Sequence, residues 1–270
     1  MIWAKMPRAQ VEAAADAAFA RMAEIEVDTS DWLVDGPVST LRSAQAGATV
    51  ALPNDLAAML RVSEPLVQMT DGAFDPTCGR VTMLWRAARA HGTPPTQQAI
   101  DTAVAGSGWA RLHFDAEAGT IAPEDPVPWL DFGGIGKGFA ADEALAVLDA
   151  RGLRHSMVEL GGDLAFGDRP PGMLGWSVAA PGQARMVVGR PCGMATSGSS
   201  EQHLDVGERR LSHVFDPRTG AAVEDRRSFT VQAATAAQAD ALASAACVLG
   251  QKVLQETLWP EYMRVSVTSH

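Results

Sequence analysis

A glycine-rich stretch at residues 131–138, with the sequence DFGGIGKG, is the part of the chain best suited to hold a phosphate. Its glycines let the backbone turn tightly and let a ligand approach the N–H and C=O groups. A helical pattern begins near Lys137, and the start of a helix directs amide donors and a positive dipole end at an anion. No Ser or Thr follows Lys137, and the spacing fits neither a P-loop nor the motif G-x-G-x-x-G. A glycine-rich turn without a ligand is the alternative interpretation.

Asp240 and Ser244 lie four residues apart in a predicted helix, so their side chains project from the same face. A carboxylate and a hydroxyl supply two hard oxygen ligands of the kind that Mg²⁺ prefers. The remaining ligands of such an ion are typically waters, a phosphate or a backbone carbonyl. The alternative is an Asp on a solvated helix face with Ser244 as filler, because Asp is seldom buried.

His213 stands near the end of a predicted strand, directly before a turn with the sequence DPRTG. A histidine in this position can act as a general base, or it can be a hydrogen-bonded surface residue. Arg218 in the same turn can clamp a phosphate or complete a local salt bridge. Thr196 and Ser197 can donate to a phosphate or simply belong to a turn.

The elements that must position these residues follow from apolar spacing and from turn residues. Helices are predicted at residues 9–25, 53–70, 81–91, 96–105, 137–150 and 236–249. Strands are predicted at residues 1–6, 156–165, 176–180, 186–188, 210–215, 229–233 and 263–267, and the second of these is interrupted by Gly161-Gly162-Asp163. A turn at Pro181-Gly182, a hairpin at 112–121 and a loop of small residues at 193–200 complete the prediction. Helices and strands mix without regular alternation, so we expect an α+β fold with mixed sheets and packed helices.

Composition restricts the class of protein. A chain of 270 residues forms one large domain or two intimate halves. The net charge of −10 argues against nucleic acid as a partner, but it permits one phosphorylated small molecule. Three scattered cysteines, Cys78, Cys192 and Cys247, suggest neither a zinc site nor a redox pair, so we expect them to be buried.

Targeting signals are not recognisable in this sequence. It contains no run of 18 apolar residues and neither a signal-peptide pattern nor a lipid-attachment cysteine. As given, the chain is expected to be cytoplasmic. If an upstream leader is removed, we expect a periplasmic protein associated with the inner membrane.

Six motifs in a fixed order resemble the ApbE family of FAD:protein FMN transferases. They lie between about residues 65 and 250, and we treat the resemblance as specific. The motifs are GAFDPT at 72–77, D-x-G-G-I-x-K-G-x-A-x-D at 131–142, GGD at 161–163, ATSG at 195–198, S-H-x-x-D-P-R-T-G at 212–220 and A-D-A-L-A-S-A-x-x-V-L-G at 239–250. The resemblance implies that residues 1–270 form a single ApbE-like, T-fold-like domain of two subdomains.

The resemblance also implies an activity and a site. Such an enzyme binds FAD and Mg²⁺, transfers FMN to a Ser or Thr hydroxyl of a target flavoprotein, and releases AMP. It implies a Mg²⁺ site formed by the backbone carbonyl of Gly134 with Asp240 and Ser244, where the family usually has Thr at the last position. His213 matches the family histidine that is the candidate base. The implied FAD contacts are Ala73, Phe74, Asp75, Asp131 and Lys137.

The sequence departs from the family pattern near its start. It begins Met1-Ile2-Trp3 without the usual Met-Gly-Thr strand, and Arg42 stands where the family has an Asn that can accept a hydrogen bond. Two other functions stay open: a Mg²⁺-dependent FAD pyrophosphatase, which would form FMN and AMP at the same site with water as the nucleophile, and a non-catalytic flavin-binding protein, which is favoured if these departures damage catalysis. The partners expected for the transferase are FAD and an acceptor flavoprotein, and subunits of membrane redox complexes are among the candidates.

Overall fold

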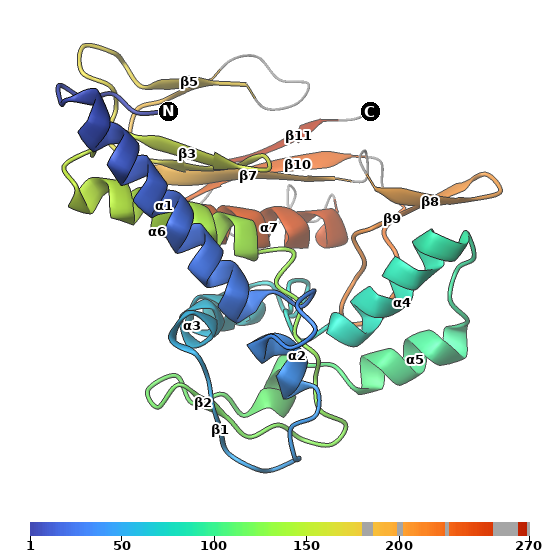
Figure 1. Ribbon diagram of the computed structural model, residues 1–270. Coiled ribbons are helices and arrows are strands. Elements are labelled where there is room, and N and C mark those ends of the chain that lie inside the picture. Colours follow the sequence, from blue (N-terminus) through green and yellow to red (C-terminus); the bar gives the residue numbers. More distant parts are fainter. Residues whose placement is uncertain (180–185, 199–201, 225–226, 251–263, 269–270) are drawn as a thin grey trace.

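A five-stranded antiparallel sheet is the centre of the computed structural model, which describes residues 1–179, 186–198, 202–224, 227–250 and 264–268 (Figure 1). Its strand order is β11-β10-β7-β4-β3, and every neighbouring pair is antiparallel. The strands are β3 (Met157–Leu160), β4 (Asp163–Phe166), β7 (Cys192–Gly198), β10 (Ser228–Ala233) and β11 (Arg264–Thr268).

Helices cover one face of this sheet and a hairpin covers the other. Helix α7 (Ala236–Leu249) packs on β7 and β10, and α6 (Gly136–Ala150) packs on β3 and β4. Helix α1 (Arg8–Thr29) crosses α6 from outside (Figure 1). On the opposite face, the hairpin of β5 (Trp176–Val178) and β6 (Met186–Val188) buries Trp176 against Phe166 and Met194.

A second group of elements lies below α6 and α7 in Figure 1. It contains α2 (Pro37–Leu41), α3 (Asn54–Met69), α4 (Gly79–His91), α5 (Gln97–Ala105), the 3₁₀ turn η1 (Trp109–Leu112), and the paired strands β1 (Val50–Ala51) and β2 (Thr120–Ile121). The hairpin of β8 (His203–Val206) and β9 (Arg209–Ser212) packs on α4 and α5 through Trp85, Ile100 and Leu211.

The main hydrophobic core joins the two groups. It brings together Leu60 of α3, Phe132 and Ile135 of the glycine-rich loop, Phe229 of β10 and Leu242 of α7. The apolar residues of the glycine-rich stretch therefore anchor it in the core, and this fixes the position of its glycines.

The α+β class is confirmed, and all six predicted helices are present, with each end within four residues of its predicted position. The three cysteines are buried and unpaired, as expected. Among the described residues, no helix combines the length and the apolar character that a membrane crossing requires.

Several local predictions are wrong. Residues 193–198 form β7, a central strand, instead of a loop; their side chains are small because α7 packs closely on this strand. The interruption predicted at GGD in the strand at 156–165 is a turn that reverses the chain, so the segment forms two strands of a hairpin, β3 and β4, instead of one. Ile2 makes only an isolated bridge to Ser156, where a strand was expected.

The hairpin predicted at 112–121 is present: Asp115 and Thr120 form an antiparallel bridge around the turn at 116–119, and the N–H of Ala122 donates to the carbonyl of Leu112 at 3.0 Å. Its second strand, β2, also pairs with β1, far away in the sequence, and residue 112 ends a 3₁₀ turn. The strand predicted at 210–215 ends at Ser212, and its partner β8 was not predicted. The predicted turn at Pro181-Gly182 lies outside the described residues. The same holds for residues 180, 199, 200 and 263, which belong to other predicted elements.

Candidate active site

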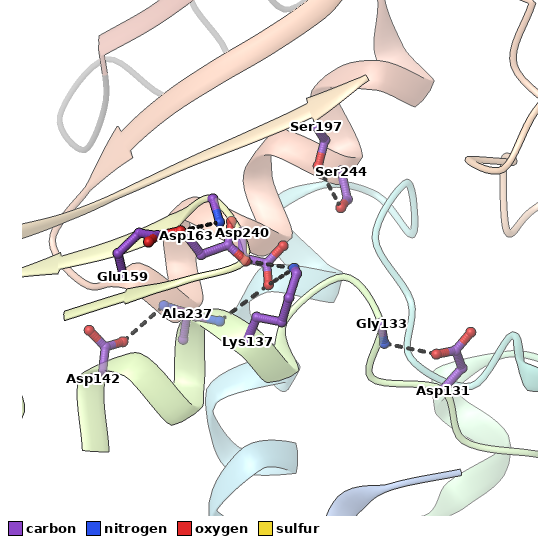
Figure 2. Close-up of polar contacts among 12 residues, drawn as sticks. Asp131, Gly133, Lys137, Asp142, Glu159, Asp163, Ser197, Ala237, Asp240 and Ser244 are labelled. Carbon is purple, nitrogen blue, oxygen red and sulfur yellow. Dashed lines mark hydrogen bonds and ion pairs between the residues drawn. The ribbon is translucent and has the colours of Figure 1, made fainter. Parts of the chain in front are cut away.

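The glycine-rich loop and the GAFDPT loop lie side by side. The backbone N–H of Asp131 donates to the carbonyl oxygen of Pro76 at 2.8 Å, and Cys78 forms a parallel bridge with Trp129. Within the glycine-rich loop, the N–H of Gly133 donates to the Asp131 carboxylate at 2.8 Å (Figure 2). The side chain of Asp131 thus holds the turn that leads into α6.

Three charged side chains meet where α6 begins (Figure 2). Nζ of Lys137 lies 2.6 Å from Oδ2 of Asp163 and 3.4 Å from Oδ2 of Asp240. Asp163 and Asp240 are only 3% and 2% exposed, whereas the Lys137 side chain is 44% exposed. The N–H of Gly138 also donates to Oδ2 of Asp240, at 3.3 Å. The cluster therefore has a buried acidic end and an ammonium group that reaches the surface.

Burial sets the proton affinities of this cluster. It raises the pKa of the Asp163 carboxyl, helped by the negative charge of Asp240, and it also raises the pKa of the Asp240 carboxyl. Burial acts to lower the pKa of Lys137, but the two carboxylates outweigh it and raise that pKa above its usual value. When both carboxyls are ionised, two carboxylates against one ammonium leave an excess of negative charge, which a bound cation would offset.

The two other predicted metal ligands lie next to each other. A Cβ atom placed on Gly134 would be 3.1 Å from Oγ of Ser244 and 3.8 Å from Cε2 of Phe74. Oγ of Ser244 also lies 3.3 Å from Oγ of Ser197, which comes from β7 (Figure 2). The structure therefore brings Gly134, Ser244 and Phe74 together, and it adds a second hydroxyl to the group.

This donor set fits Mg²⁺ by its chemistry. A carboxylate from Asp240, a hydroxyl from Ser244 and the carbonyl of Gly134 are all hard oxygen ligands. Within the described part of the chain, no group of three or more His, Cys, Asp or Glu side chains could hold a metal by itself. A cation here would need further ligands from water or substrate, as is usual for Mg²⁺.

Asp75 is engaged within its own loop. Its Oδ1 accepts hydrogen bonds from the N–H and the hydroxyl of Thr77 at 2.8 and 2.6 Å, and its Oδ2 accepts one from the N–H of Trp109 at 3.1 Å. Burial raises the pKa of the Asp75 carboxyl. Ala73 and Phe74 are also buried. The FAD contacts predicted at these three positions stay predictions.

An aromatic residue that sequence reasoning missed lies near Asp131. The Trp32 side chain is 71% exposed, and the guanidinium of Arg86 lies 4.1 Å from its ring centroid. The same guanidinium pairs with Asp31 and lies 3.7 Å from Oδ1 of Asp131. No local pattern marks Trp32 or Arg86, because only the packing of α4 beside the loop after α1 brings them together.

His213 follows β9, and both its backbone N–H and its ring contact one carbonyl. The N–H donates to the oxygen of Gln202 at 3.0 Å, and Nδ1 lies 3.0 Å from the same oxygen. Donation from Nδ1 would leave Nε2 as the nitrogen able to accept a proton. The role of His213 as a base stays a prediction.

The other polar candidates have structural partners. Arg218 forms a two-bond salt bridge with Asp216, at 2.8 Å each, so the salt-bridge interpretation is confirmed. Its Cγ would lie 3.5 Å from a Cβ on Gly72, which joins the DPRTG turn to the GAFDPT loop. The Thr196 hydroxyl pairs with that of Thr230 across β7 and β10 at 2.9 Å.

Residues 3–264 match the model of the ApbE family. The chain belongs to the ApbE family. The motif resemblance seen in the sequence is therefore confirmed over nearly the whole chain.

Two relatives show how close the similarity is. An FAD:protein FMN transferase of Treponema pallidum is 30% identical, over 92% of this chain and 75% of that protein. Another FAD:protein FMN transferase, from Salmonella typhimurium, is 28% identical, over 90% of this chain and 74% of that protein.

Solved ApbE structures share the fold. The ApbE protein of Thermotoga maritima superimposes with a TM-score of 0.85 at 23% identity, covering 99% of this chain and 91% of that one. The apo form of the Pseudomonas stutzeri flavinyl transferase ApbE gives a TM-score of 0.81 at 25% identity, covering 95% of this chain and 86% of that one. The fold described above is thus the ApbE fold.

Proposed function

We propose that this chain is a Mg²⁺-dependent FAD:protein FMN transferase that attaches FMN to a Ser or Thr hydroxyl of an acceptor flavoprotein and releases AMP. The observation that carries the proposal is the cluster of Lys137, Asp163 and Asp240 at the start of α6, with Ser244 next to Gly134 and one turn of α7 beyond Asp240. The names of the family relatives support the activity.

The residues present suit a reaction at the pyrophosphate of FAD. Asp240, Ser244 and the Gly134 carbonyl would hold Mg²⁺, which when bound supplies positive charge to the pyrophosphate and the leaving AMP. The start of α6 and the ammonium of Lys137 add further positive potential at the same place. This arrangement would hold the FMN phosphorus within reach of an incoming hydroxyl.

The proposed transfer step forms one bond and breaks one. The acceptor oxygen bonds to the FMN phosphorus, and the bond from that phosphorus to the bridging oxygen of AMP breaks, with its electron pair leaving on AMP. Nε2 of His213 takes the proton of the hydroxyl, which is too weak an acid to lose it unaided at neutral pH. Positioning of the two reactants supplies much of the remaining rate, as in other phosphoryl transfers.

The test is to incubate the protein with FAD, Mg²⁺ and a flavin-acceptor domain that carries a target Thr. Transfer is expected to give a fluorescent acceptor band on a denaturing gel, together with AMP in equal amount. An acceptor with its target Thr changed to Ala is the control and should stay dark. Free FMN and AMP without a fluorescent acceptor would instead indicate a pyrophosphatase, and FAD binding without turnover would indicate a non-catalytic flavin protein.

His213→Ala tests the base separately from binding. We expect transfer to fall about 10²–10⁴-fold, the usual contribution of a general base, while FAD affinity measured by fluorescence titration stays close to that of the parent. Full transfer activity in this variant would remove His213 from the mechanism without affecting the metal assignment.

A further inference from the structure

The Lys137 ammonium is shared unequally between two buried carboxylates. It lies 2.6 Å from Oδ2 of Asp163, at the start of β4, and 3.4 Å from Oδ2 of Asp240, on α7 (Figure 2). The shorter contact is a strong charge-assisted hydrogen bond, whereas the longer one is near the limit for a hydrogen bond. Asp163 is therefore the main partner of the ammonium.

The turn that carries Asp163 holds Lys137 at two points. Gly161 and Gly162 have φ values of +58° and +94°, which favour glycine, and the N–H of Gly162 donates to the Glu159 carboxylate at 3.0 Å. A Cβ atom on Gly161 would lie 3.3 Å from Cδ of Lys137, so the turn packs on the lysine stem as well as pairing with its ammonium. The GGD sequence thus fixes where the ammonium points.

The direction of the ammonium matters because Asp240 is the only carboxylate among the proposed Mg²⁺ ligands. A lysine paired fully with Asp240 would compete with a cation for the same oxygens, since ion pairs are strong at a buried site. Asp163 draws the ammonium toward β4 and at the same time offsets its charge. Without Asp163, the carboxylate that pairs with Lys137 in the described part of the chain is that of Asp240.

We propose that Asp163 is a positioning residue that holds the Lys137 ammonium away from Asp240, so that the Asp240 carboxylate stays available to a divalent cation. The inference rests on the proposed function, because it takes Asp240 as a cation ligand. It assigns to the GGD motif a task in cation binding.

The test is to titrate the FAD-free protein with Mn²⁺, which serves as a probe for Mg²⁺. Electron paramagnetic resonance measures the concentration of the free ion. Asp163→Asn keeps the size of the side chain and removes its charge, so we expect the affinity for Mn²⁺ to fall by about tenfold or more. Glu159→Gln is the matched control: it removes a negative charge from the same turn but keeps an oxygen for Gly162, and its affinity should match the parent.

Two variants of Lys137 show whether competition is the cause. Lys137→Met should bind Mn²⁺ at least as tightly as the parent, because the competing ammonium is gone. The double variant Lys137→Met with Asp163→Asn should recover most of the affinity lost in Asp163→Asn. Parent affinity in Asp163→Asn, or weakened binding in Lys137→Met, would overturn the proposal, and the second result is decisive even if Asp163→Asn fails to fold.

Asp240→Ala separates this inference from the metal assignment. If it binds Mn²⁺ as tightly as the parent, Asp240 is not a ligand and both proposals fail. If it loses binding while Asp163→Asn keeps it, the metal site stands and only the role of Asp163 is rejected.

Discussion

At the scale of the residue, Asp240 carries a charge in a place where the fold gives it little support. It sits in an alanine-rich helix, 2% exposed, and its partners include the Lys137 ammonium at 3.4 Å and the Gly138 N–H at 3.3 Å. Burial raises the pKa of this carboxyl, because the ionised form loses its hydration. Residues that oppose stability in this way are typical of functional sites.

Asp240→Asn should therefore separate stability from activity. We expect the free energy of unfolding of the metal-free protein, measured in urea, to stay within about 1 kcal/mol of the parent or to rise, because no buried charge has to be accommodated. FMN transfer should fall by about 10²-fold or more, since a neutral amide is a poor Mg²⁺ ligand.

The matched control for this variant is Asp101→Asn, at an exposed position on α5, which should change neither quantity. Transfer within a few-fold of the parent in Asp240→Asn would contradict the ligand role. A large loss of stability would show that the carboxylate supports the fold instead.

Part of this site could be predicted from the sequence, and the rest could not. The spacing of Asp240 and Ser244 and the glycines before Lys137 were visible, because each set lies in one continuous segment. The contact between Lys137 and Asp163 was not, since it forms only when the β3–β4 hairpin folds back over the start of α6. A contact between residues 26 positions apart leaves no period in the sequence.

At the scale of the element, the start of α7 is held from two sides. The Asp142 carboxylate of α6 accepts hydrogen bonds from the N–H groups of Ala236 and Ala237, both at 2.9 Å. A Cβ atom on Gly138 would lie 2.3 Å from the Ala236 carbonyl oxygen, and one on Gly193 would lie 2.1 Å from the Ala236 nitrogen. This close packing fixes the position of α7 against α6 and β7, and with it the position of Asp240.

The same packing explains why β7 was predicted as a loop. Glycine and alanine are needed on this strand because a helix backbone lies directly against it, and they hide the alternation that usually identifies a strand. Helices were predicted well, since their apolar spacing is local. Strand pairing depends on distant partners and was predicted less well.

Asp142→Ala should destabilise the protein by about 1–3 kcal/mol, because two buried N–H groups at the start of α7 lose their acceptor. It should also weaken Mn²⁺ binding, since the helix that carries Asp240 is no longer tied to α6. Urea unfolding and Mn²⁺ titration measure the two effects. Asp142→Asn keeps one acceptor oxygen, so we expect an intermediate loss of stability.

Glu143→Ala, on the neighbouring residue of α6, is the control for a general effect on that helix. Its carboxylate pairs with Arg21 of α1 at 2.8 Å, and it should lower stability without changing Mn²⁺ affinity. Equal Mn²⁺ affinity in Asp142→Ala and the parent would show that the cap does not set the position of Asp240.

At the scale of the whole molecule, the candidate site lies where the two groups of elements meet. The sheet supplies Asp163 and Ser197, α7 supplies Asp240 and Ser244, and the loop after α3 supplies Phe74. The chain as a whole carries a net charge of −10, and Lys137 is one of only three lysines. The proposed function therefore takes its positive potential for a phosphate from local sources: Lys137, the start of α6 and a bound cation.

This arrangement predicts that FAD and Mg²⁺ stabilise the molecule together. Ligands that bind only the folded state raise the free energy of unfolding by about 2.7 kcal/mol at a hundredfold excess over their Kd. We expect a clear rise in Tm with FAD and Mg²⁺, a smaller rise with either alone, and reversal of the Mg²⁺ part by a chelator. In Asp240→Asn the Mg²⁺ part should disappear while that of FAD remains. The contrary result is that FAD stabilises the parent protein equally with and without Mg²⁺. The cation would then not join the nucleotide to the protein. The site would have to bind the pyrophosphate through Lys137 and the start of α6 alone.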